Sequence, residues 1–105
     1  MANYLLAYHG GGMAPTEEER ARIMEAWGKW FQALGPALVD GGNPTAQAKT
    51  IASDGTATDG GGINPLTGYS ILAADDLDAA VELAKGCPVL LSGGTVEVAE
   101  IMQVM

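Results

Sequence analysis

Cysteine and histidine are almost absent from this 105-residue sequence, which contains one of each, Cys87 and His9. A single cysteine forms no internal disulfide, and this usage is typical of a reducing, cytoplasmic compartment. One cysteine and one histidine also fall short of a typical zinc site, which draws several ligands from these two residue types. We therefore expect a cytoplasmic protein with no disulfide, no metal site and no cofactor.

Basic residues are scarce as well. Five Lys and Arg stand against thirteen Asp and Glu, so the net charge is −8. Binding to nucleic acid or to anionic lipid depends on basic side chains that neutralise phosphate groups. We expect no nucleic-acid partner and no membrane partner.

Long apolar runs are missing too, and every candidate is far shorter than the ~20 residues that a membrane-spanning helix needs. The opening segment MANYLLAYHGGG contains no Lys or Arg, so it lacks the basic flank of a signal peptide. Apolar residues nevertheless make up 48% of the chain and charged residues 17%, which indicates a folded protein. The length fits one domain over residues 1–105.

The pattern of apolar residues predicts the element order β-α-β-β-α-β. The most distinct element is a helix over residues 15–36, where Thr16 and Glu19 form a capping box and apolar residues recur every three or four positions. A second helix is predicted over residues 75–88, capped by Asp75 or Asp76. Strands are predicted over 3–9, 37–53 (interrupted near 41–45), 67–74 and 95–102, with a further short strand at 89–91.

This order is that of the split β-α-β arrangement, and we predict an α+β, ferredoxin-like βαββαβ fold. The first two strands would run parallel on either side of the antiparallel third, with the fourth beside the first. Both helices would cover one face of the sheet. Strand 3–9 carries apolar side chains on both faces, so we expect the second face to pack against another copy in a homodimer.

Two triple glycines, at residues 10–12 and 60–62, follow His9 and Asp59. Since strands 3–9 and 67–74 would run in opposite directions, both glycine segments should lie at one rim of the sheet. A phosphate cradle is disfavoured, because the glycines lack the spacing and the nearby basic residue of such loops. Three glutamates at the start of the first helix would also repel an anion.

His9 and Asp59 are the candidate catalytic residues at this rim. A carboxylate beside a histidine can fix its tautomer and raise its basicity, so His9 would act as a general base. Asp54 is an alternative partner. In the competing interpretation, His9 only ends a strand and bonds a loop carbonyl, while the glycines form turns.

Four further residues are candidate ligand contacts. The glycines, Gly10, Gly11 and Gly60, would let the backbone approach a small-molecule ligand and offer amide donors to an oxyanion. Tyr69 lies near the same rim and could donate a hydrogen bond, although packing across neighbouring strands explains it equally well. Trp27, Trp30 and Phe31 are expected in the core, and Cys87 as a buried structural thiol.

Several segments together resemble the YCII-related, or DGPF-domain, family: YLLAYHG, WGKWFQALG, TDGGGINPLTGYSILAADDLDAAVELAKGCP and GGTVEVAEI. The resemblance covers nearly the whole chain. It implies a ferredoxin-like fold that forms a dimeric α-β barrel. It also implies enzymatic activity from a His and an Asp in a cleft, as in a relative that removes chloride from chlorinated hydroquinones, or a regulatory role beside extracytoplasmic-function sigma factors.

By this resemblance His9 matches the family's strand-one histidine, and Asp59-Gly60 matches the start of the D-G-P-F motif. Gly61-Gly62 replaces the Pro-Phe, which weakens any transfer of substrate contacts. The first hypothesis is a lyase or isomerase in which His9 acts as base on a small ring compound. The alternatives are a non-catalytic ligand-binding or regulatory module on the same fold, and a protein-protein adaptor.

Overall fold

The computed structural model describes residues 1–11 and 16–104. The predicted helix start at residue 15 and Gly12 of the first triplet lie outside this range. The elements in chain order, with η for a 3-10 helix, are β1 (Ala2–His9), α1 (Glu17–Leu34), η1 (Gly35–Ala37), β2 (Leu38–Asp40), β3 (Lys49–Ile51), β4 (Ala57–Asp59), β5 (Leu66–Ala74), α2 (Leu77–Ala84), η2 (Pro88–Ser92) and β6 (Thr95–Glu100).

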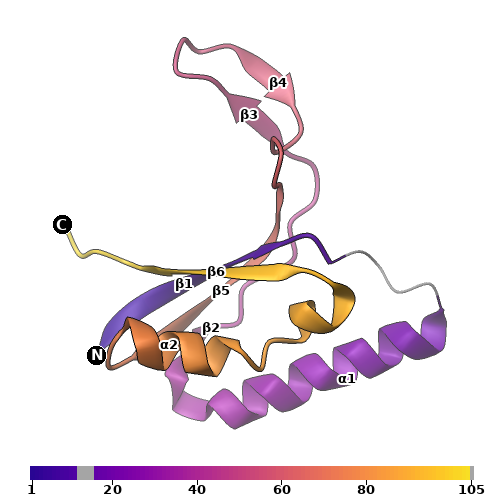
Figure 1. Cartoon of the computed structure of the whole chain (residues 1–105), viewed down its shortest axis with the longest axis vertical. Coiled ribbons are helices and arrows are strands. Elements are labelled where there is room, and N and C mark those ends of the chain that lie inside the picture. Colours follow the sequence, from indigo (N-terminus) through magenta and orange to yellow (C-terminus); the bar gives the residue numbers. More distant parts are fainter. Residues whose placement is uncertain (12–15, 105) are drawn as a thin grey trace.

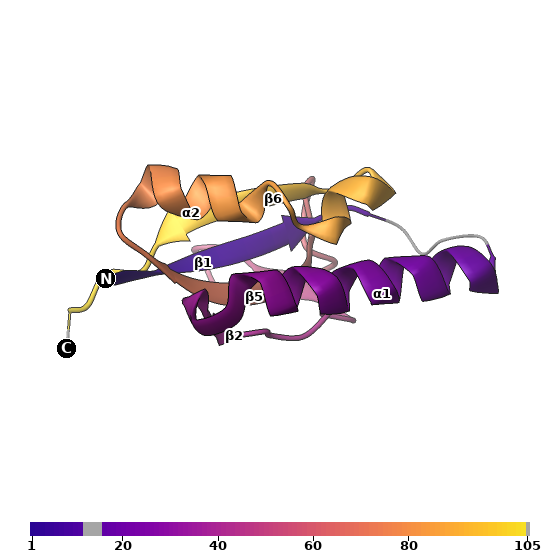
Figure 2. The ribbon, with the colours of Figure 1, turned by 90° about the horizontal axis from the view of Figure 1, so that it is seen from below.

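Four strands form one antiparallel sheet in the order β2-β5-β1-β6. The sequence predicts this strand order, with β5 between β1 and β2, and the structure confirms it. Both helices lie on one side of the sheet (Figure 2). The chain is therefore an α+β structure compatible with a ferredoxin-like fold.

Side-chain caps start both helices. Thr16 Oγ1 accepts a hydrogen bond from the Glu19 N–H at 3.1 Å, and Asp76 Oδ1 accepts one from the Ala79 N–H at 2.8 Å. These contacts confirm the predicted cap at Thr16 and choose Asp76 over Asp75. No helix in the described part of the chain combines the length and the apolar character needed to cross a membrane.

Two predictions about local structure are wrong. The segment 37–53 is not one interrupted strand: only β2 joins the main sheet, while β3 pairs with β4 in a separate hairpin. The predicted strand at 89–91 lies within the 3-10 helix η2. There the Leu90 N–H donates to the Cys87 carbonyl, a local bond that replaces strand pairing, and Pro88 has no N–H to offer a neighbouring strand.

Burial alternates along β1 and β5, so the two faces of the sheet differ. The face toward the helices carries the buried side chains, among them Leu6 and Leu72, which are fully buried. Within the described residues no helix covers the opposite face, and most of its side chains on β1 and β5 are half-buried. We call it the open face; on β1 and β5 it consists of Leu5, Ala7, His9, Thr67, Tyr69, Ile71 and Ala73.

The segment between β2 and β5 leaves the body of the molecule. We call residues 43–66 the arm; every one of them is exposed, and the β3–β4 hairpin is its outer part. The arm rises from the sheet on the side opposite α1 and α2 (Figure 1). A hairpin gives its residues little to pack against, which explains why sequence patterns for a buried strand fail here.

Candidate functional site

His9 ends β1 on the open face, and both nitrogens of its imidazole have partners. Nδ1 lies 3.0 Å from the Asn64 carbonyl oxygen, and Nε2 lies 3.2 Å from Oε1 of Glu97 on β6. The His9 side chain is only 13% exposed, whereas Glu97 is 67% exposed. The histidine is thus held at a fixed place on the rim of the sheet, next to one carboxylate.

Both partners of this ring are hydrogen-bond acceptors. A neutral imidazole carries one N–H and can donate to only one of them, whereas the doubly protonated ring donates to both. A change in protonation of His9 therefore makes or breaks one of the two contacts.

Asp59 lies elsewhere, on β4 of the arm. Its Oδ1 pairs with Lys49 Nζ at 3.4 Å, directly across the hairpin, and its side chain is 93% exposed. Asp54, the alternative, accepts the Thr56 N–H at 2.9 Å, a bond that holds the pKa of this carboxyl below its usual range. Within the described residues the carboxylate that meets His9 is Glu97, and neither aspartate contributes a contact to the ring.

The three candidate glycines do not form one ligand contact, because they lie in two separate parts of the molecule. Gly10 and Gly11 have φ angles of 70° and 72° and turn the chain after β1. The Gly60 N–H donates to the Ala48 carbonyl at 2.9 Å, so this amide is used inside the arm. Gly11 lines the cavity described next, whereas Gly10 and Gly60 do not.

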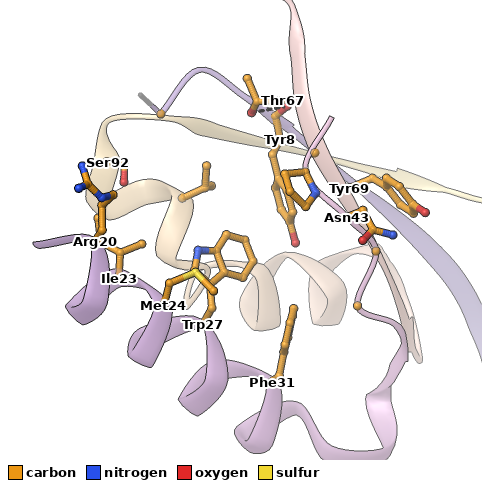
Figure 3. A pocket seen from close by; sticks show the side chains of 16 residues that line it. Tyr8, Arg20, Ile23, Met24, Trp27, Phe31, Asn43, Thr67, Tyr69 and Ser92 are labelled. Carbon is orange, nitrogen blue, oxygen red and sulfur yellow. Dashed lines mark hydrogen bonds between the residues drawn. The ribbon is translucent and has the colours of Figure 1, made fainter. Parts of the chain in front are cut away.

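A cavity of about 480 Å³ lies on the helix side of the sheet, between α1 and the ends of β1 and β5. Its lining is largely apolar, and the side chains come from α1, from β1, from the start of the arm and from η2 (Figure 3). Volumes of this order are typical of sites for small organic ligands. The lining residues on α1 are Arg20, Ile23, Met24, Trp27 and Phe31.

Aromatic rings form the inner wall of this cavity. The Trp27 ring packs edge-on against Tyr8 at a centroid distance of 5.4 Å and lies 5.7 Å from Phe31. The Tyr69 ring points away from Tyr8 (Figure 3), and the alternation of burial along β5 puts Tyr69 on the open face. Tyr69 therefore lines the cavity without joining its aromatic wall.

A buried hydrogen-bond chain holds Tyr8 in place behind the cavity. The Tyr8 hydroxyl donates to Ser70 Oγ at 2.7 Å, and Ser70 Oγ donates to the Gly41 carbonyl at 2.7 Å. Burial raises the pKa of Tyr8 well above the ordinary value for tyrosine, so the phenol stays neutral and keeps donating. The chain ties β1, β5 and the segment after β2 together around the cavity.

Cys87 is 2% exposed, and burial raises the pKa of its thiol. It packs in the core with Trp30 and Leu34, which agrees with the expectation of a structural thiol. Among the described residues, no group of three or more His, Cys, Asp and Glu side chains is placed to hold a metal ion.

The sequence contains one signal for this cavity, although it does not predict where the cavity lies. The apolar stripe of α1 continues through Ile23 and Met24, one turn before the buried part of the helix. Ile23 is half-buried and Met24 is exposed, so the apolar stripe extends beyond the part of the helix that packs in the core. The contribution of residues 41–44, which lead from β2 into the arm, has no comparable signal.

The fold and the cavity define a small two-layer α+β protein with a largely apolar cavity between its first helix and its sheet. The chain belongs to the family described as the YCII-related domain, which matches residues 1–105. This confirms the resemblance noted in the sequence. No curated protein matches the chain significantly.

Proposed function

We propose that this YCII-related protein binds a small, largely apolar organic molecule in the cavity between α1 and the sheet. The observation that carries this proposal is the aromatic wall of Tyr8, Trp27 and Phe31 around an open volume of about 480 Å³. Aromatic faces bind flat, apolar ligands well. Arg20, Asn43 and Ser92 provide polar groups at the border that would orient such a ligand.

Filling part of the cavity should weaken binding. We expect 8-anilinonaphthalene-1-sulfonate or phenol to bind saturably to the wild-type protein, followed by dye fluorescence or by calorimetry. Replacement of half-buried Ile23 by Trp occupies part of the volume and should weaken binding at least about tenfold. The control is Leu77→Trp, an equal gain in size at a 47% exposed position of α2 that does not line the cavity. Equal binding by both variants would rule out this cavity as the site.

A second candidate function, acid-base catalysis by His9, is favoured by its contact with Glu97. In this alternative, His9 moves a proton of a small ring compound at the open face, in the manner of a lyase or isomerase. General acid-base catalysis contributes about 10²–10⁴ in rate, so His9→Asn should lower the turnover of a true substrate at least about a hundredfold. An unchanged turnover in a folded His9→Asn protein would exclude the role.

The identity of the carboxylate partner can be tested without a substrate. His9 is the only histidine in the chain, so its imidazole NMR signals need no assignment. We expect Glu97→Gln to shift these signals and Asp59→Asn to leave them unchanged, because Asp59 pairs with Lys49. The opposite result would support the His9–Asp59 pair predicted from the sequence.

We further propose that the protein is a homodimer in which two open faces pack together as a dimeric α-β barrel. The open face supports this, because apolar side chains such as Leu5 and Ile71 are left without a covering layer. His9 would then line the space between the two sheets. A monomer in sedimentation experiments at micromolar concentration would refute the dimer.

A further inference from the structure

The molecule has more exposed surface than its mass explains. Its accessible surface is 7260 Å², whereas a compact monomer of 10.8 kDa exposes about 5,500 Å². The radius of gyration is 15.0 Å, against about 13 Å for a compact chain of this length. The difference is more than about 1,700 Å² per chain, roughly twice the ~800 Å² that each partner buries in a stable interface of standard size.

The arm is one source of this exposed surface. None of its residues, 43–66, is buried, and its apolar side chains include Ile51 at 72% and Ile63 at 106% exposure. The hairpin is held by its own contacts, among them the Lys49–Asp59 ion pair and the bond from Thr50 Oγ1 to the Gly60 carbonyl. An isolated two-stranded hairpin is only marginally stable in water, so a surface to pack against would stabilise this arm.

We propose that the arm of each chain clasps a second copy of the same chain. The arm and the open face lie on the same side of the sheet, at an angle to one another (Figure 1). A copy that packs on the open face is therefore flanked by the arm, and one partner covers both unpartnered surfaces. A twofold arrangement repeats this contact in both directions, which is the commonest symmetry of soluble oligomers.

This inference rests on the proposed homodimer and adds to it that the arm is part of the interface. In a face-to-face dimer without arm contacts, the hairpin would stay fully solvated. In the clasped dimer, apolar Ile51 and Ile63 become buried against the partner, and the hairpin is stabilised by association.

The test compares dimer dissociation constants, measured by sedimentation or mass photometry, for Ile51→Glu and Ile63→Glu. We expect each variant to weaken the dimer at least about tenfold. The matched control is Leu91→Glu, which adds the same charge at an equally exposed position, 72%, in η2 on the body of the molecule; it should change the constant by less than about twofold.

A second measurement uses the wild-type protein. Lys49 is the only Lys or Arg between residues 30 and 84, so trypsin cleaves the arm at this point alone. The clasped dimer predicts that cleavage at Lys49 slows as the protein concentration rises above the dissociation constant. The clasp is refuted, and the homodimer kept, if the wild-type protein dimerises but two results follow. The arm variants have the same dissociation constant as Leu91→Glu, and the rate of cleavage at Lys49 does not depend on protein concentration. A wild-type monomer refutes both.

Discussion

Gly42→Ala is expected to be one of the two most damaging single replacements in this protein. Gly42 has a φ angle of +70°, where a side chain is strained. A Cβ built at this position would collide with the carbonyl oxygen of Tyr69, because the chain leaving β2 passes directly over β5. The backbone must move apart, and we expect the free energy of unfolding to fall by about 3 kcal/mol or more.

The consequences of this replacement should extend to the cavity and the arm. Gly42 lines the cavity, and the next residue, Asn43, accepts the Tyr69 N–H at the root of the arm. Urea unfolding at a fixed protein concentration measures the stability, and dye binding measures the cavity. Both should decline together in Gly42→Ala.

The neighbouring glycine provides the matched control. At Gly41 no unusual φ angle is present, and an added Cβ would lie 3.5 Å from the Phe31 ring, an ordinary contact distance. We expect Gly41→Ala to change stability by less than about 1 kcal/mol. If both variants lose the same free energy of unfolding, the close approach of Gly42 to Tyr69 is not the reason that position 42 requires glycine.

Trp30→Ala is expected to remove a comparable share of the stability. Trp30 is 7% exposed, its Nε1–H donates to the Leu83 carbonyl at 3.1 Å, and its ring lies so close to Gly86 that an added Cβ there would be 3.0 Å away. Trp30 thus connects α1 to the end of α2 on the helix side of the sheet. Deleting a buried tryptophan side chain costs about 3–5 kcal/mol, which approaches the whole stability of many small domains.

Met24→Ala is the control for Trp30→Ala, because Met24 is a large apolar residue of the same helix that is 71% exposed. Its loss should cost under about 1 kcal/mol in chemical unfolding at the same protein concentration. If both variants lose the same amount, the contact between α1 and α2 does not belong to the cooperative core. A Trp30→Phe variant should lie in between, because it keeps a ring but loses the bond to Leu83.

The elements that local chemistry specifies were predictable. The start of α1 follows from the Thr16 side chain and the acidic first turn, and the stripe of Trp27, Trp30 and Leu34 follows from helical periodicity. The strand order follows from the alternation of elements, because the connections allow few other arrangements. Placing His9 at the end of its strand required only the glycines that come after it.

The elements that depend on distant contacts were not predictable. A strand such as β3 has the same kind of sequence whether it joins the main sheet or forms an outlying hairpin, and its pairing with β4 is seen only in the tertiary structure. The partner of His9 illustrates the same limit. Glu97 is 88 positions away, and Ala7 stands opposite it in the register of β1 with β6.

The sequence by itself determined the class of fold, the capped helices, the acidic surface and the family of this protein, because each depends on composition or on spacing within one element. Only the tertiary structure decided that Asp59 lies on an arm, that Glu97 meets His9, and that α1 stands off the sheet far enough to leave a cavity. These features arise from the register between strands and the separation between layers, and neither is encoded in a short stretch of residues.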